Sequence, residues 1–560
     1  MDSKLDAEAI TGIFIDSNLH GSDITAQRMA GFEKTKVRSL GRATSSLGAR
    51  APSKACATLA AAGPTFAGPR PAMLFNSLHF LVFFPLVVGL YYALPARWRA
   101  PLVLLASYYF YFSWRPEYTL LLAATTLLDY YSGLRMSRLR TQAQRRPWLY
   151  LSLASNLGTL FLFKYFNFFR DTANGLAEAL HLPMAAPALA LVLPVGVSFY
   201  TFQSVAYIVD VYKGKLEAER NLGRFALFVA FFPQLVAGPI ERGSQMLPQL
   251  RQSHEFDYGG VASGLRLMAW GMFKKVVIAD RLALLANPVF DHPRRFDSLA
   301  LVLAVAAFTG QIYADFSGYT DLARGSARVL GYQLVLNFRQ PYLATSVGDF
   351  WRRWHLSLSN WFRDYVYIPL GGSRRSPARN YANILIVFLL SGLWHGASWT
   401  FVVWGALHGL YLVAENWTAP IRTSLAKLTG LAARPRLHRV LASAATVALV
   451  AYAWIFFRAN SLPDAFYIST HLFRGWGKLH PAQLQGLLAG LGRHFVAELL
   501  VAAGAVALLA VADYRAERGS VAAWLARWPA PLRWASYLGL LLATLYGGVF
   551  GSNQFIYFQF

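Results

Sequence analysis

Two histidines lie in an apolar stretch of the chain that carries no charged side chain. Residues 389–409 read LLSGLWHGASWTFVVWGALHG and include His395 and His408. An imidazole in hydrocarbon loses its hydration, so each ring should have a hydrogen-bond partner or a task. Burial disfavours imidazolium, and a neutral ring can accept the proton of a hydroxyl that attacks a carbonyl carbon. Gly392 and Gly396 flank His395 and leave space there for a substrate.

His395 is the stronger catalytic candidate of the two. Trp394, Trp399 and Trp404 could line the wall of a substrate passage beside it. A structural hydrogen bond between helices explains the same histidine equally well. His408 is about 140° away around a continuous helix, so we expect it to lie apart from His395 in a structural role.

A dense group of aromatic and basic residues surrounds His355. On one continuous helix the apolar residues share a face with this histidine, opposite the arginines. Members of that face are Trp351, Trp354, His355, Leu358, Trp361 and Phe362. The pattern predicts a helix lying in the membrane interface with His355 on its aromatic side. Alone this histidine would anchor the helix; paired with His395 it could orient the base or stabilise a developing oxyanion.

Asp315 follows Gln311 by one helical turn at the end of an apolar segment, 298–318. A carboxylate at the centre of a membrane helix costs about 2.5–3.5 kcal/mol on insertion scales. Asp315 should therefore face a polar cavity or a cationic partner. We expect a structural ion pair with a nearby arginine rather than a catalytic role.

The chain that positions these side chains has the composition of a polytopic helical membrane protein. Of its 560 residues, 55% are hydrophobic and only 14% are charged, and Phe, Tyr and Trp supply 15%. Thirteen apolar segments, among them 187–211, approach the length of a membrane-spanning helix. Several are short or interrupted by Gly and Pro, so we expect an all-α protein with about eleven transmembrane helices plus interfacial or re-entrant helices.

The net charge of +25 lies mainly in connectors between the apolar segments, such as 135–148, 212–224 and 371–380. Basic connectors are typical of cytoplasmic loops that contact anionic lipid, so we expect no nucleic-acid partner. The single cysteine, Cys56, excludes an internal disulfide and a Cys-ligated metal site, and no metal is expected.

The first 72 residues differ in character from the rest. They are polar and rich in small residues, and an apolar run begins abruptly at Met73. Residues 1–72 are either a disordered extension or upstream codons annexed to a natural start at Met73. The functional domain is expected to be 73–560.

Four stretches of that domain resemble the membrane-bound O-acyltransferase family, in particular its bacterial polysaccharide branch typified by alginate O-acetylation. They are MLFNSLHFLVFFPLVVGLYYALP from Met73, FFPQLVAGPIERGSQMLPQL (231–250), residues 315–374, and SGLWHGASWTFVVWGALHG (391–409). The resemblance implies that His395, in L-W-H-G, is the family's signature histidine and that His355, in W-R-R-W-H, is the second one of this branch. It implies a helical fold around a central tunnel, with acetyl-CoA as donor substrate and no bound cofactor.

The resemblance also implies a location in the bacterial inner membrane, contact with lipid, a periplasmic SGNH-type acetyltransferase as partner, and an exported polysaccharide such as alginate as final acceptor. The chain ends in FIYFQF, and related systems have a similar tail, whose tyrosine is proposed to accept the acyl group. Tyr557 is thus a candidate acyl relay, with an interfacial anchor as the equal alternative. A phenol needs a base to attack a thioester, which a neutral histidine offers.

The sequence therefore favours a membrane O-acyltransferase with His395 as general base and His355 as helper. Trp394, Trp399, Trp354 and Asp315 would support the passage. Two alternatives stay open: transfer of D-alanyl or another acyl group to a wall polymer, and a transporter or flippase that uses His395 and Asp315 as a proton relay. A scaffold that only recruits the periplasmic transferase is a further rival.

Overall fold

The computed structural model describes residues 73–183, 186–235, 238–474, 495–550 and 555–556. Both expectations for 1–72, a disordered extension or a misassigned start, lie outside the described residues. Every regular element in the described ranges is helical, as the composition predicts.

The first half of the described chain contains short and medium helices with clear end signals. Ser77, Thr141 and Asn221 each accept a backbone N–H at a helix start, the typical N-cap arrangement. The helices are α1 (Leu78–Ala93), α2 (Ala96–Phe112), α3 (Pro116–Ser137), α4 (Gln142–Leu160), α5 (Phe166–Ala179), α6 (Val197–Tyr212), α7 (Leu222–Ala230), α8 (Phe232–Leu235) and α9 (Gly243–Leu250).

The second half contains the longest helices and the short ones that carry the candidate site. They are α10 (Tyr258–Phe273), α11 (Asp280–Asp291), α12 (Ser298–Val329), α13 (Val347–Trp351), α14 (Leu356–Phe362), α15 (Pro377–His395), α16 (Trp399–Trp417), α17 (Ala419–Leu428), α18 (Pro435–Arg458), α19 (Leu462–His471), α21 (Phe495–Arg518), α22 (Val521–Ala526) and α23 (Ala530–Gly547). Three π-helical turns interrupt or extend these helices: Phe161–Tyr165, Lys274–Ala279 and Arg363–Tyr367.

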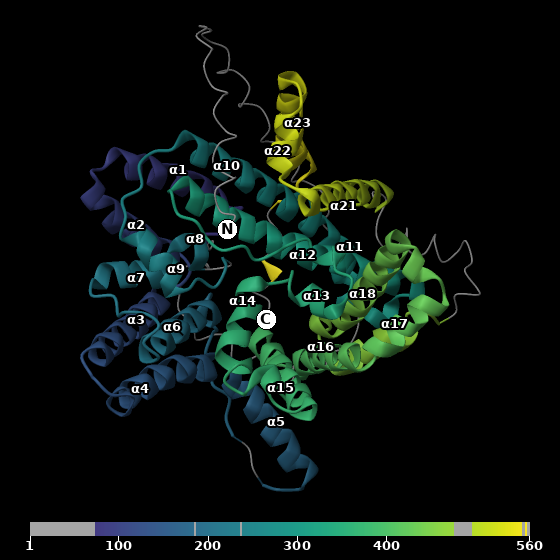
Figure 1. Cartoon of the computed structure of the whole chain (residues 1–560), viewed down its shortest axis with the longest axis horizontal. Coiled ribbons are helices and arrows are strands. Elements are labelled where there is room, and N and C mark those ends of the chain that lie inside the picture. The colour runs from purple at the N-terminus through teal and green to yellow at the C-terminus, as the bar shows by residue number, and fades with distance from the viewer. Residues whose placement is uncertain (1–72, 184–185, 236–237, 475–494, 551–554, 557–560) are drawn as a thin grey trace, which may run out of the picture. The chain divides into compact units, whose positions relative to one another are not determined.

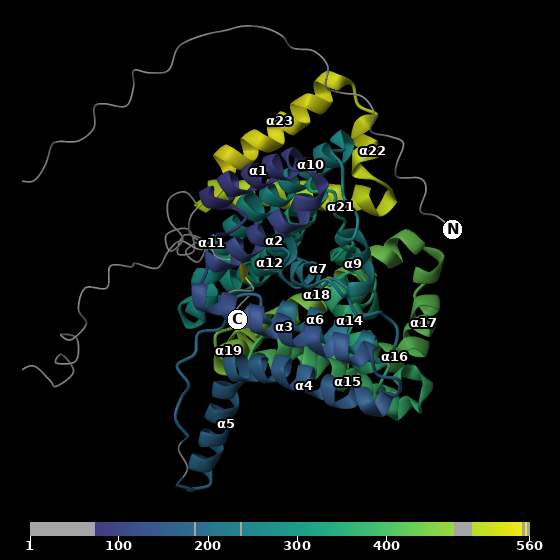
Figure 2. The same ribbon diagram turned by 90° about the vertical axis from the view of Figure 1, so that its left-hand side faces the viewer.

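α12 is the central helix of the described part. It contacts α10 and α11 on one side and α18 on another, and Figures 1 and 2 both show it between the elements around α23 and those around α15. Glycines allow the close contact with α10: a Cβ on Gly271 would lie 2.7 Å from the Gly318 oxygen, and one on Gly264 would lie 2.8 Å from the Gly325 oxygen. Small residues that bring backbones together are characteristic of membrane helix packing.

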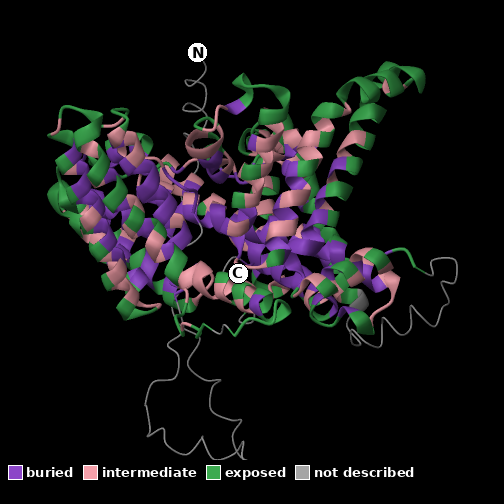
Figure 3. Ribbon diagram, turned by 90° about the horizontal axis from the view of Figure 1, so that it is seen from below, coloured by how far each residue is buried: buried purple, intermediate pink, exposed green. Residues whose placement is uncertain are grey.

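Side chains on the outer helices are strongly apolar although they are exposed. Figure 3 shows buried residues concentrated inside the helical body and exposed ones along its periphery. On α1 the exposed fractions of Leu78, Leu81, Val82 and Leu86 lie between 60% and 75%. Exposed apolar surface on this scale suits contact with lipid rather than water.

Among the residues that the structure describes, three helices have both the length and the apolar composition to cross a membrane: Ser298–Val329, Pro435–Arg458 and Ala497–Arg518. The apolar segment 187–211 is not one helix, because α6 begins only at Val197 after an extended run. Gly196 has a left-handed backbone, with φ of 74°, and a Cβ there would lie 2.5 Å from the Leu235 oxygen. This close approach ends the extended run and starts the helix.

Candidate active site

His395 is the last residue of α15 and is only 3% exposed. The helix ends there because Gly396 adopts an extended backbone, and a Cβ on this glycine would lie 2.1 Å from the Phe401 ring. After a short turn, Ser398 caps the start of α16 by accepting from the Thr400 N–H. The histidine thus occupies the turn of a helical hairpin, with its ring inside the protein.

The glycines beside His395 serve helix packing rather than substrate space. A Cβ on Gly392 would lie 2.3 Å from the Phe401 oxygen, and one on Gly405 would lie 2.3 Å from the Phe388 oxygen. These two glycines let α15 and α16 meet backbone to backbone. The expectation that Gly392 and Gly396 leave room for a substrate is therefore wrong, because atoms of α16 occupy the space beside both glycines.

His355 is fully buried, and it breaks the predicted interfacial helix into α13 and α14. Its φ of 44° and ψ of 54° place it in the left-handed region, which is rare for a residue other than glycine. Residues 337–339 stabilise this interruption of the helix through two main-chain hydrogen bonds. The Arg339 N–H donates to the Arg353 oxygen at 2.9 Å, and the Leu356 N–H donates to the Asn337 oxygen at 2.9 Å. The prediction of one continuous helix through 351–362 is wrong because these backbone groups bond outside the helix. Strained residues of this kind cluster at functional sites.

The break brings His355 beside His395. The centroids of the two imidazole rings are 6.3 Å apart, with 54° between the ring planes. Trp394 contacts both rings, with centroid distances of 5.8 Å to His355 and 4.8 Å to His395. Trp404 and Phe457 close the other sides of His395 at 4.9 and 5.3 Å. Two imidazoles thus share one aromatic enclosure without a nearby carboxylate among these contacts.

The predicted supporting tryptophans divide into two groups. Trp394 is 3% exposed and Trp354 is fully buried, and the Trp354 ring packs on Trp454 in a tilted arrangement at 5.2 Å. Trp399 is 49% exposed and packs on Phe168 at the surface. Trp399 therefore does not belong to the buried enclosure, because the turn after His395 directs the start of α16 outward.

His408 occupies a structural position next to the enclosure. Its Nδ1 accepts the indole N–H of Trp351 at 3.2 Å, and its ring packs on Trp404 at 5.0 Å. Trp404 also contacts His395, so one indole separates the two histidines. The angle estimated for a continuous helix does not apply, because α15 and α16 are separate helices.

Lys164 is a site residue that the sequence reasoning missed. Its ammonium donates to the main-chain oxygens of Trp394 at 2.7 Å and His395 at 3.0 Å. A cation on the last carbonyls of a helix satisfies them and complements the helix dipole. The π-helical turn Phe161–Tyr165 carries this lysine to the end of α15. A lone lysine within the apolar run LFLFKYFNFF is the signal that marks it.

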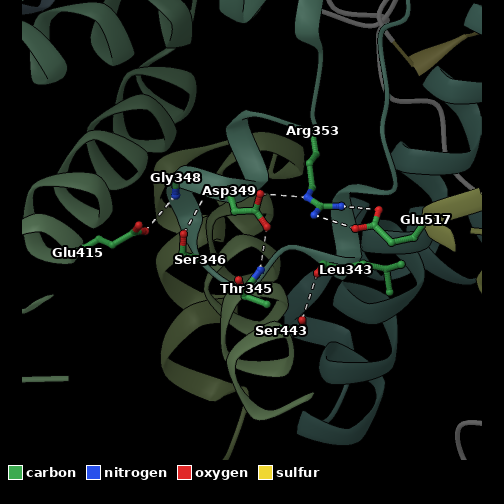
Figure 4. Close-up of polar contacts among 9 residues, drawn as sticks. All are labelled: Leu343, Thr345, Ser346, Gly348, Asp349, Arg353, Glu415, Ser443 and Glu517. Carbon is green, nitrogen blue, oxygen red and sulfur yellow. Dashed lines mark hydrogen bonds and ion pairs between the residues drawn. The ribbon is translucent and has the colours of Figure 1, made fainter. Parts of the chain in front are cut away.

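A polar network fixes the short helix that precedes His355 (Figure 4). The Gly348 N–H donates to Glu415 of α16 at 3.0 Å. The Arg353 guanidinium bonds Asp349 at 3.0 Å and both carboxylate oxygens of Glu517 on α21, at 2.8 and 3.1 Å. Helix α13 is thereby tied to two distant helices, and the backbone entering His355 is held in place.

Asp315 is buried on α12, and its cationic partner is a lysine rather than an arginine. The Lys275 ammonium lies 2.8 Å from Asp315 Oδ1 and 2.8 Å from Asp280 Oδ1. Lys275 comes from the π-helical turn between α10 and α11. Asp315 also accepts the N–H of Ile556, near the end of the chain, at 2.7 Å. Tyr557, the next residue, lies outside the described residues.

Within the described ranges, no three His, Cys, Asp or Glu side chains group closely enough to hold a metal ion. What the enclosure can do chemically depends on its two imidazoles. A neutral imidazole accepts a proton at one nitrogen and donates a hydrogen bond from the other. Two such rings around one reacting group suit proton removal from a hydroxyl together with stabilisation of a developing oxyanion.

Comparisons with known proteins show which family and which relatives this chain is similar to. The model of the family described as membrane-bound O-acyltransferase (MBOAT) matches residues 221–454, which include both histidines. The chain is 40% identical over 456 residues to the probable alginate O-acetylase AlgI of Azotobacter vinelandii, covering 80% of this chain and 86% of the relative. It is 41% identical over 429 residues to that of Pseudomonas aeruginosa, covering 75% and 79%. The peptidoglycan O-acetyltransferase of Helicobacter pylori is 35% identical over 431 residues, covering 71% and 79%.

Proposed function

The chain belongs to the membrane-bound O-acyltransferase family, and we propose that it passes acetyl groups from cytoplasmic acetyl-CoA across the bacterial inner membrane for O-acetylation of exported alginate. It is an all-helical membrane O-acyltransferase. The names of its relatives support acetyl as the group and alginate as the polymer. The observation that carries the proposal is the pair of buried imidazoles, His355 and His395, 6.3 Å apart.

His395 acts as the general base in this proposal. Its imidazole takes the proton of the acceptor hydroxyl while the hydroxyl oxygen attacks the thioester carbonyl carbon. His355 donates a hydrogen bond to the oxygen that becomes negative in the tetrahedral intermediate. The carbon–sulfur bond then breaks, and the leaving thiolate takes the proton from the His395 imidazolium. The products are the acetyl ester and free CoA, so the chain needs no bound cofactor.

Donor and acceptor must reach rings that protein encloses. We infer a tunnel that joins the two membrane faces at the His355–His395 pair, within about eleven transmembrane helices and several interfacial or re-entrant ones. The basic connectors 135–148, 212–224 and 371–380 would face the cytoplasm, where their charge attracts the CoA phosphates and anionic lipid head groups. The acetyl group would leave on the opposite side.

The acyl group then needs a carrier toward the polymer. We propose Tyr557 as the relay: its phenol oxygen takes the acetyl group from CoA, and a periplasmic SGNH-type transferase passes that group to the polysaccharide. Support comes from the residues before it, since Phe555 and Ile556 are 0% and 1% exposed. Phe555 packs on Phe316, whose ring lies 4.6 Å from His355. Phe316 therefore separates Phe555 from His355.

Thioester consumption by the purified protein tests the proposed function. The wild-type protein in proteoliposomes should release CoA from acetyl-CoA, and His395→Ala should lower the rate of that release by about 10²–10⁴-fold. His79→Ala is the matched control, because His79 is an exposed histidine on α1. A transporter, a flippase or a recruiting scaffold would release no CoA in any of these samples. If the protein consumes a D-alanyl thioester but not acetyl-CoA, the transferred group is D-alanyl instead of acetyl.

A further inference from the structure

The main chain just after α23 is held against the π-helical turn Lys274–Ala279 and the start of α11. The Val549 N–H donates to the Val276 oxygen at 2.9 Å, and the Arg281 guanidinium bonds the Gly547 oxygen. A π-helical turn shifts the hydrogen-bond register of a helix, and such turns occur frequently at functional sites. The turn thus bonds the main chain after α23, and it also carries Lys275, which pairs with Asp315.

A buried charged cluster holds the last described residue. Lys275 lies between Asp280 and Asp315 at 2.8 Å from each, and the three side chains are at most 4% exposed. Both carboxylates thus contact the same ammonium. The Ile556 N–H, 2.7 Å from Asp315 Oδ2, donates a charge-assisted hydrogen bond to that cluster. Asp315 therefore bonds both the Lys275 ammonium and the main-chain N–H of Ile556.

An aromatic contact fixes the same segment from a second direction. Phe555 is fully buried, and its ring lies 4.2 Å from that of Tyr319 and 5.9 Å from that of Phe316. On α12, Tyr319 follows Asp315 by four residues and Phe316 by three, so it is a helix-surface neighbour of each. Phe316 also packs on His355 at 4.6 Å. Helix α12 thus joins the chain end to the two-histidine site.

We propose that the cluster Lys275–Asp280–Asp315 is an internal docking site for the C-terminal segment, with Asp315 as the positioning residue that holds the chain end beside His355 and His395. The docking itself follows from the contacts of Phe555 and Ile556. Its consequence for acyl transfer rests on the proposed function. In the described residues 555–556, a main-chain hydrogen bond and an aromatic side chain make the contacts named above, so the binding can be weakened without removing the helices around it.

Carboxypeptidase digestion of the full-length protein in detergent tests the docking, with intact mass as the readout. In the wild-type protein we expect trimming to stop before Ile556, because the docked segment is withheld from the protease. Asp315→Ala should let trimming continue past Phe555 at least about tenfold faster, since it removes a hydrogen bond to a charged group. Asp321→Ala is the matched control: Asp321 lies on the same helix and pairs with Lys274 at 2.6 Å, away from the tail.

Two further variants keep the test decisive if Asp315→Ala folds poorly. Phe555→Ala leaves the charged cluster intact and should also release the tail. Asp315→Asn keeps an oxygen that can accept the Ile556 N–H, so its trimming should be slower than that of Asp315→Ala. Equal trimming of wild type, Asp315→Ala and Phe555→Ala would overturn the docking site.

An activity measurement separates positioning from a general structural role. Asp315→Ala and deletion of 555–560 should each lower acetyl transfer to an acceptor, and the combined change should lower it no further. If the deletion variant keeps full activity while Asp315→Ala loses activity, Asp315 acts only by stabilising the helices around it. If the deletion speeds acetyl transfer, the C-terminal segment inhibits the reaction. Either result would overturn the inference. Tail release by Asp315→Ala in a protein that consumes no thioester would instead contradict the proposed function and leave the docking standing.

Discussion

The imidazole rings of His355 and His395 lie 6.3 Å apart inside one aromatic enclosure, although His355 precedes α14 and His395 ends α15, and both residues are buried. Each ring reaches this position because the helix is interrupted or ends at that histidine. His355 occupies a left-handed turn between α13 and α14, and His395 ends α15 where Gly396 turns the chain. The relative placement of the two rings therefore depends on the geometry of two turns.

The two histidines should contribute unequally to acyl transfer. His395→Ala removes the base and should lower the rate of CoA release by about 10²–10⁴-fold, the range for general base catalysis. His355→Ala should lower kcat by a smaller factor, about 10²-fold, because it removes one hydrogen bond to the oxyanion. His355→Gln should recover part of that loss, since an amide N–H can still donate. Steady-state CoA release measures all three, and an equally active His395→Ala protein would contradict the assignment.

Lys164 should position His395 rather than react. Lys164→Met keeps the apolar stem and removes the two hydrogen bonds to the Trp394 and His395 oxygens. Because small displacements of a catalytic group are costly, we expect a 10–100-fold loss in kcat, to an order of magnitude, with little change in KM. Lys215→Met is the matched control, because Lys215 is exposed in a connector. A normal kcat in Lys164→Met would show that α15 ends correctly without the lysine.

The candidate histidines are visible in the sequence because an imidazole in an apolar stretch is costly to bury. The same reasoning predicts a buried, paired Asp315, and the structure confirms a pair. The identity of the partner, Lys275, depends on a π-helical turn that no simple periodicity indicates. Pattern analysis assumes unbroken helices, so it places His355 on a continuous helix that does not form.

Contacts to main-chain atoms are harder still to predict, because they depend on no particular side chain in the partner segment. Lys164 bonds carbonyl oxygens more than two hundred residues away, and Asp315 bonds the N–H of Ile556. Either bond could form with many other sequences at the partner position. Such contacts follow from tertiary structure alone, whereas the burial of their charged members follows from composition.

The glycine contact between α10 and α12 should be sensitive to a single methyl group. A Cβ on Gly271 would lie 2.7 Å from the Gly318 oxygen, so Gly271→Ala forces the two helices apart. Overpacking of this kind typically costs about 1–3 kcal/mol. Thermal unfolding in detergent should show a clear fall in the midpoint. Gly89→Ala on α1 is the control: nothing lies within 4 Å of its Cβ position, and the higher helix propensity of alanine should leave stability equal or slightly higher.

The connector between α6 and α7 should lose stability in acid through Glu219. Burial alone would raise the pKa of this carboxyl, but the Asn221 N–H and the Arg251 guanidinium, which bonds it at 2.9 and 3.0 Å, outweigh burial and lower it. A depressed pKa stabilises the folded chain above the unfolded value, and that contribution is lost as pH falls through the folded value. Glu219→Gln should therefore lower the unfolding midpoint at pH 7, and the difference from wild type should shrink below about pH 4, near the ordinary pKa of Glu. Glu217→Gln, a change at an exposed neighbour, is the control. A difference that stays constant from pH 7 to pH 3 would show that Glu219 contributes through packing and not through its charge.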